Sequence, residues 1–98
     1  MDFRVARTES AWRELEAAVV YIAEDSPRYA SAFMDEARSA ARSLHWAPQR
    51  GRTVPEIDNP AIREIFVKRY RLIYEMSGQT VLIISFLHGA RQFPDTTR

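Results

Sequence analysis

Hydrophobic residues along the chain recur first at every second position, then at spacings of three and four, and finally at every second position again. Phe3 and Val5 alternate with Arg4 and Ala6, which predicts a short strand over residues 2–7. The following apolar residues have the spacing of a helix and predict an amphipathic helix over residues 9–24. Its apolar stripe consists of Trp12, Leu15, Val19 and Ile22.

A second helix is predicted over residues 27–46. Ser26 can cap the first free backbone N–H groups, and Pro27 at the first helical position sacrifices no hydrogen bond. The intervening loop is so short that the two helices must form a hairpin. Trp46, at the helix end, is expected to cover the core. The apolar stripe of this helix consists of Ala30, Phe33, Ala37, Ala40 and Leu44.

Residues 47–61 break the pattern with proline, glycine and polar residues, and so predict a long loop. Loops of this length in a small domain are often functional. Three strands are expected after it, over residues 62–67, 70–76 and 80–88. Residues 81–84 are all apolar, as in a strand buried on both faces, and are therefore expected at the centre of the sheet.

The predicted order of elements is β-α-α-β-β-β, which is typical of an α+β fold. We expect one domain over residues 1–98, with the helical hairpin packed on one face of a three- to four-stranded, mainly antiparallel sheet. The opposite face is then at least partly open. Cationic side chains on such a face would make it a binding surface.

Composition excludes several classes of function. The chain has no cysteine, so disulfides, thiolate metal sites and cysteine nucleophiles are excluded, and two histidines alone argue against a metal centre. No apolar run is long enough for a membrane span, and a cytoplasmic protein is expected. Residues 1–49 carry a net charge of −2 and residues 50–98 a net charge of +3. This asymmetry favours an anionic partner for the C-terminal half.

An arginine interrupts the apolar strand of residues 70–76. Strand alternation places Arg71 on the same face as Ile73. A guanidinium group there is costly to desolvate without an anion, so its partner is either a carboxylate of the chain or a phosphate of a ligand. The first alternative is a structural ion pair with Glu64 or Glu75. The second makes Arg71 part of a binding surface.

A histidine and an arginine stand three residues apart at the end of the last strand. His88 can act as an acid or base near neutral pH and Arg91 can neutralise a phosphate, although His88 also fits an ordinary surface or capping residue. The last strand is expected beside the strand of Arg71, which would bring the three side chains to one surface. Glu56, in the long loop, is either a general base or a solvated charge.

Taken in order, several short motifs make the chain resemble the RelE/ParE superfamily of toxins along essentially its whole length. They are residues 21–27 between the helices, 51–56 in the loop, 62–65 and 70–74 in the strands, and His88-Gly89-Ala90-Arg91 at the end. The resemblance implies a toxin of a type II toxin–antitoxin system, neutralised by a cognate antitoxin in a hetero-oligomeric complex. RelE-like members cut messenger RNA on the ribosome, whereas ParE-like members poison DNA gyrase.

For the nuclease branch, the resemblance implies that Arg71 contacts the scissile phosphate, Glu56 acts as base, and His88 is an acid or base beside Arg91. No metal or cofactor is implied. Nucleases of this kind often end in a tyrosine, and no tyrosine follows Tyr74. Further cations expected to bind the target are Arg52, Arg63, Lys68 and Arg69.

The ending His88-Gly89-Ala90-Arg91 is common among ParE-like members. The resulting interpretation is a ParE-like toxin that poisons gyrase. A RelE-like, ribosome-dependent messenger RNA endonuclease is the alternative, and an inactive interaction domain is a further one. Whether the chain is an enzyme stays open at this point.

Overall fold

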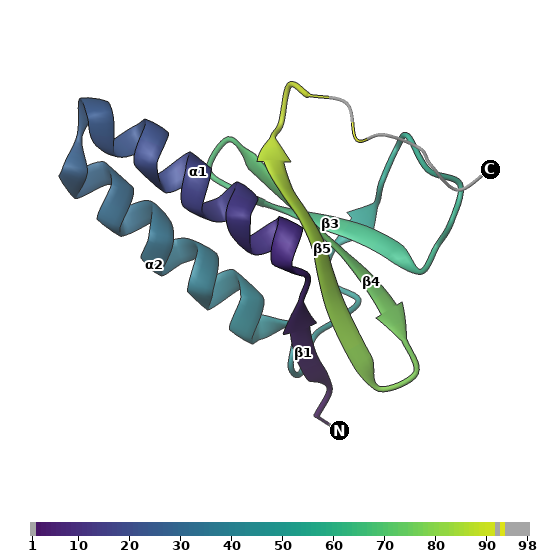
Figure 1. Ribbon diagram of the computed structural model, residues 1–98. Coiled ribbons are helices and arrows are strands. Elements are labelled where there is room, and N and C mark those ends of the chain that lie inside the picture. Colours follow the sequence, from purple (N-terminus) through teal and green to yellow (C-terminus); the bar gives the residue numbers. More distant parts are fainter. Residues whose placement is uncertain (1, 92, 94–98) are drawn as a thin grey trace.

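The computed structural model of the protein describes residues 2–91 and 93, and within them two helices and five strands follow the order β-α-α-β-β-β-β (Figure 1). Each predicted helix and strand is present, with its ends shifted by at most three residues. In chain order the elements are β1 (Arg4–Arg7), α1 (Glu9–Asp25), α2 (Pro27–Ser43), β2 (Arg52–Thr53), β3 (Ile62–Val67), β4 (Tyr70–Ser77) and β5 (Thr80–His88).

Side-chain caps determine where the two helices begin. The Thr8 hydroxyl accepts a hydrogen bond from the N–H of Ala11 at the start of α1. The Ser26 hydroxyl accepts one from the N–H of Tyr29 at the start of α2, directly before Pro27. Because Ser26 alone separates the helices, they fold back on each other as the predicted hairpin.

The sheet has the strand order β1-β5-β4-β3-β2, with β1 parallel to β5 and all other neighbours antiparallel. The prediction that residues 81–84 form its centre is wrong, because β4 is the middle strand and is buried without interruption from Arg71 to Tyr74. The additional edge strand β2, which pairs with β3, makes β4 and not β5 the middle strand. Its two exposed residues have no apolar alternation that would have predicted it.

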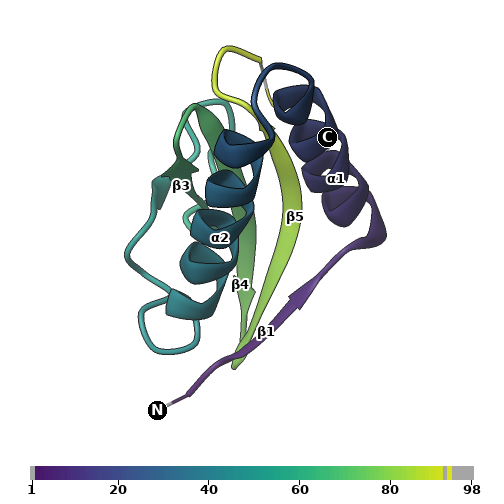
Figure 2. The ribbon, with the colours of Figure 1, turned by 90° about the vertical axis from the view of Figure 1, so that its left-hand side faces the viewer.

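The helical hairpin covers one face of the sheet, as predicted, with α1 over β5 and α2 over β3 (Figure 2). Phe33 of α2 is fully buried there, between the rings of Tyr70 and Phe86. The opposite face was expected to be partly open. Instead, Val54 and Ile57 of the long loop pack over it. Beneath them lie Ile62, Ile73 and Leu87.

Buried hydrogen bonds fix the start of this loop to the sheet. The Tyr74 hydroxyl donates to the carbonyl of Pro48 at 2.7 Å and accepts from the N–H of Gly51 at 3.1 Å. Burial raises the pKa of the Tyr74 phenol above its ordinary value, so the phenol stays a donor. A Cβ atom at Gly51 would lie 2.5 Å from the Tyr74 hydroxyl, so the approach of the loop requires glycine.

Trp46 does not cover the core, in contrast to the prediction. Helix α2 ends at Ser43, and the following turn leaves Trp46 67% exposed, stacked on His45. Leu44 closes that end of the core instead and is fully buried. Neither α1 nor α2 has the length and apolar character needed to cross a membrane, and residues 2–91 and 93 contain no other helix.

Two aromatic residues, Phe33 in α2 and Trp46 in the turn that follows it, should differ sharply in their effect on stability. Phe33→Ala leaves a cavity between helix and sheet and should lower the free energy of unfolding by about 3–5 kcal/mol. Trp46→Ala removes an exposed side chain and should change it by less than about 0.5 kcal/mol. Urea denaturation followed by circular dichroism measures both values. A loss for Trp46→Ala equal to that for Phe33→Ala would contradict this account of the core.

Candidate functional site

The guanidinium group of Arg71 lies inside the protein, between two carboxylates. Only 4% of the residue is exposed. Its Nη1 and Nη2 atoms donate to the two oxygens of Glu56 at 2.8 and 2.7 Å, and its Nε donates to Glu64 at 2.7 Å. Arg71 Nη1 also donates to the carbonyl oxygen of Arg91 at 2.9 Å. The donors of this arginine are thus turned towards the chain itself.

Glu64 extends the ion pair into a network of four charged groups. Its second oxygen accepts a hydrogen bond from Nε of Arg52 at 2.6 Å, and the Glu64 side chain is fully buried. We call Arg52, Glu56, Glu64 and Arg71 the buried ion network; Glu64 and Arg71 are its buried members, Glu56 is half-buried, and the side chain of Arg52 is 60% exposed. The four residues come from β2, the long loop, β3 and β4, and their formal charges cancel. Removal of Glu64 or Arg71 would leave an uncompensated charge inside the protein, which typically costs several kcal/mol.

The network holds Glu56 and Arg71 in their charged forms. Hydrogen bonds from Arg71 lower the pKa of the Glu56 carboxyl from 4.5 to about 2, against the opposing effect of burial. The same hydrogen bonds, together with Glu64, raise the pKa of Arg71. A carboxylate this acidic is a weak proton acceptor near neutral pH.

The structural ion pair between Arg71 and Glu64 that the sequence allowed is therefore present. The other alternative, in which Arg71 is part of an open binding surface, is not what the structure shows. Desolvating a guanidinium group requires an anion, and the chain supplies two carboxylates, one of them from the loop that covers this face of the sheet. Glu56 is likewise an ion-pair partner and not a freely solvated charge.

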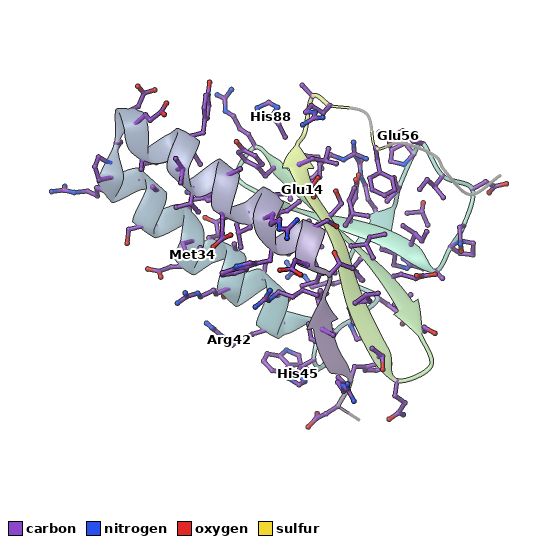
Figure 3. All side chains as sticks on the ribbon, viewed as in Figure 1. Glu14, Met34, Arg42, His45, Glu56 and His88 are labelled. Carbon is purple, nitrogen blue, oxygen red and sulfur yellow. The ribbon has the colours of Figure 1, made fainter. Side chains whose placement is uncertain are left out.

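His88 lies on the face of the sheet opposite to Arg71. It stands across from Tyr70, whose ring packs against Phe33 on the helix side, whereas Arg71 stands across from Leu87. Figure 3 shows His88 at the end of β5 towards the helices and Glu56 beyond that strand. The expectation that Arg71 and His88 share one surface is therefore wrong.

A β-bulge explains this outcome. The pairing of β4 with β5 changes register between Ile73 and Tyr74, so that Ile84 is an extra residue in β5. In an unbulged hairpin, His88 would have faced the same side as Arg71. One extra residue turns every later side chain to the other face.

The remaining predicted cations do not form one cluster. Arg63 lies across from Tyr74 on the helix side and donates to the carbonyl of Gly51 at 2.9 Å. Lys68 forms an ion pair with Glu36 at 3.2 Å. Arg69 and Arg91 are exposed and form no ion pair within residues 2–91 and 93.

Arg91 connects the buried ion network with a hollow on the surface. Its carbonyl group binds Arg71, while the residue itself lines a hollow of about 460 Å³ together with His88, Tyr70 and Tyr21. The sequence analysis did not select Tyr21. The sequence signal that could have identified Tyr21 is that it is aromatic but lies one position before Ile22, outside the apolar stripe of α1. No group of three or more metal-binding side chains occurs in the described part of the chain.

Comparisons with solved structures show which known fold the chain has. The chain is similar to a structure titled chromosomal ParDE TA system from P. aeruginosa, with a TM-score of 0.70 and 16% identity over 88% of this chain and 95% of that one. It is also similar to the toxin-antitoxin complex RelBE2 from Mycobacterium tuberculosis, with a TM-score of 0.60 and 23% identity over 90% and 99% of the two chains. The hairpin on a mostly antiparallel sheet is thus the RelE/ParE-like fold.

Sequence comparisons show the family to which the chain belongs. A family described as the ParE toxin of type II toxin-antitoxin system, parDE, matches residues 5–93. Toxin RelE1 of Caulobacter vibrioides is 33% identical over 96 residues, which cover 94% of this chain and 99% of the relative. The chain belongs to the ParE toxin family, within the RelE/ParE superfamily of type II toxin–antitoxin systems.

The lowered pKa of Glu56 predicts acid sensitivity. In the unfolded chain Glu56 takes up a proton near pH 4.5, whereas in the folded protein it does so only near pH 2. Its contribution to stability, on the order of 3 kcal/mol, is therefore present above about pH 4.5 and is lost as the pH falls towards about 2. Glu56→Gln should remove this part of the pH dependence and destabilise the protein at neutral pH.

Urea denaturation at about pH 7 and about pH 3 measures this effect. Asp58→Asn is the matched control, because Asp58 is an exposed carboxylate in the same loop. It should keep the acid sensitivity of the unsubstituted protein. Equal losses of stability on acidification in the unsubstituted protein and in Glu56→Gln would show that the ion pair does not stabilise the fold.

Proposed function

We propose that this toxin acts as a ParE-like poison of DNA gyrase, without a nuclease centre of its own. The observation that carries this proposal is that the guanidinium group of Arg71 is already bound by groups of its own chain. The guanidinium group is bound by Glu56, by Glu64 and by the carbonyl oxygen of Arg91. A scissile phosphate would have to displace these partners from a site covered by the long loop.

The placement of the acid and base candidates also supports a toxin without a nuclease centre. Cleavage of RNA requires a base for the ribose 2′-hydroxyl and cations at the phosphate, both within reach of one reacting group. Glu56 has a pKa of about 2, and His88 lies across the sheet from Arg71. The parts of the proposed nuclease centre therefore do not face one substrate.

Sequence similarity to a relative named Toxin RelE1 favours a second candidate function. At 33% identity over 96 residues, a RelE-like cleavage of messenger RNA on the ribosome is the alternative. It would require the loop that carries Glu56 to open on the ribosome and release Arg71. An inactive interaction domain is the third reading, under which expression without antitoxin is harmless.

Purified protein distinguishes the two active alternatives. With DNA gyrase, ATP and supercoiled plasmid, the toxin should accumulate cleaved DNA, and its expression should induce the DNA-damage response. In a purified translation reaction it should leave messenger RNA intact. Ribosome-dependent cleavage products, together with normal supercoiling by gyrase at excess toxin, would contradict the proposal and establish the RelE-like alternative.

We further propose a cognate antitoxin as the second partner. The two similar structures are titled as a toxin–antitoxin system and a toxin-antitoxin complex. On this chain, a groove of about 270 Å³ between α1 and α2 has an apolar floor formed by Leu15, Leu72 and Phe86. Such a groove fits apolar side chains of an amphipathic segment.

Arginines at the rim of this groove indicate the charge of that segment. Arg7, Arg38 and Arg42 line the groove, and none of them forms an ion pair in the part of the chain that the structure describes. Arg7 stacks over the ring of Trp12, 4.2 Å from its centroid. Unneutralised arginines beside an apolar floor favour an antitoxin segment that alternates apolar and acidic residues.

Charge reversal tests this partner. Arg42→Glu, on the exposed end of α2 (Figure 3), should weaken antitoxin binding by about tenfold or more, because the acidic segment then meets a like charge. Arg28→Glu, at the exposed start of α2, is the matched control and should bind normally. Calorimetry with the antitoxin encoded beside the toxin measures both. Unchanged affinity of Arg42→Glu would argue against this groove.

A further inference from the structure

Two adjoining hollows lie where the helical hairpin meets the ends of the strands. One, of about 460 Å³, lies between α1 and β5, and the other, of about 190 Å³, lies between the hairpin and the turn from β3 to β4. Tyr21, Tyr70 and His88 line both. We call the residues around them the hairpin-end surface: Tyr21, Tyr29, Arg69, Tyr70, His88 and Arg91.

The larger hollow follows from the way β1 and α1 leave the sheet. Strand β1 pairs with β5 only as far as Ile83, so the rest of β5 has α1 as its neighbour. At this level α1 carries Ala17 and Ala18, whose small side chains leave space. The carboxylate of Glu14, which is labelled in Figure 3, accepts a hydrogen bond from the N–H of Phe86 at 2.8 Å. This part of the strand edge is therefore not free for another strand. The hollow is therefore suited to a side chain of a partner.

Large hydrophobic side chains are exposed around these hollows. Of the five large hydrophobic residues that are exposed in the described part of the chain, two line these hollows, Tyr21 and Tyr29; Val20 is next to Tyr21 in α1 but lines neither hollow. Tyr21 is the most exposed, at 72%. Exposed tyrosines beside a hollow are typical of a protein interface, where tyrosine and arginine often contribute most of the binding energy.

The charges around the hollows favour an acidic segment of a protein. Arg69 and Arg91 are exposed, and within residues 2–91 and 93 they have no carboxylate partner. They can therefore pair with single carboxylates of a partner. Asp25, one helical turn beyond Tyr21, is exposed and forms no ion pair within residues 2–91 and 93, so it would repel the continuous negative charge of a nucleic acid.

The buried ion network fixes the turn that carries His88 and Arg91. Arg71 binds the carbonyl oxygen of Arg91, and the N–H of Gly89 donates to the carbonyl of Arg69 at 2.7 Å. A Cβ atom at Gly89 would lie 3.0 Å from that carbonyl oxygen, so the close approach favours glycine. The turn is thus held in place before any partner arrives, which reduces the entropic cost of binding.

We propose that the hairpin-end surface is where the toxin contacts its protein target. An apolar side chain of the target enters the hollow beside Tyr21 and Tyr70, and an adjacent carboxylate pairs with Arg91. Arg71 acts here as a positioning residue, through the backbone of Arg91. This inference rests on the proposed function, because it takes DNA gyrase as the target.

The test measures the toxin concentration that gives half-maximal DNA cleavage by gyrase on supercoiled plasmid. Tyr21→Ser and Arg91→Glu should each raise it by about tenfold or more. The matched controls are Trp46→Ser, which removes another exposed aromatic ring, and Arg4→Glu, which reverses another exposed arginine on β1. Both should act like the unsubstituted toxin. Equal urea midpoints for all variants show that the changes act on binding.

Three results would overturn the inference. If the unsubstituted toxin traps cleaved DNA and Tyr21→Ser and Arg91→Glu do so equally well, the surface does not contact gyrase, although the proposed function stands. If these variants lose affinity for plasmid DNA in the absence of gyrase, the surface binds nucleic acid. If the unsubstituted toxin leaves gyrase unaffected, the proposed function fails and the inference fails with it.

Discussion

The ion pairs of Arg71 with Glu56 and Glu64 are the interaction on which the rest of the structure depends. A guanidinium group in the middle strand of the sheet needs compensating anions, and the chain provides one from β3 and one from the long loop. The loop must therefore lie over the face opposite the helices. The same guanidinium group binds the carbonyl oxygen of Arg91 and so fixes the turn after β5.

This arrangement separates the charged residues of the chain into a structural set and an exposed set. Arg52 and Arg71 neutralise carboxylates of their own protein, whereas Arg69 and Arg91 remain available to a partner at the end of the helical hairpin. The apolar groove edged by Arg42 lies towards the other end of the hairpin (Figure 3). Under the proposed function, target and antitoxin are therefore recognised through different parts of one small domain.

Most of the fold could be predicted from local patterns, because caps and apolar periodicity act over a few residues. Ser26 and Pro27 defined the hairpin in this way. The candidate site could not be predicted as well, because it depends on contacts between distant residues. Glu56 reaches Arg71 from a loop without periodicity, and the bulge at Ile84, which turns His88 to the helix side, has no signature in the apolar run that contains it.

The state of the Glu56 carboxyl tests the central claim most directly, namely that the arginine inside the sheet is structural. An NMR titration that follows the carboxyl carbon of Glu56 in the folded protein gives its pKa without reference to any activity. A pKa of about 2 is expected for a carboxylate bound by both terminal nitrogens of Arg71. A pKa near neutrality, as a general base requires, would contradict the account.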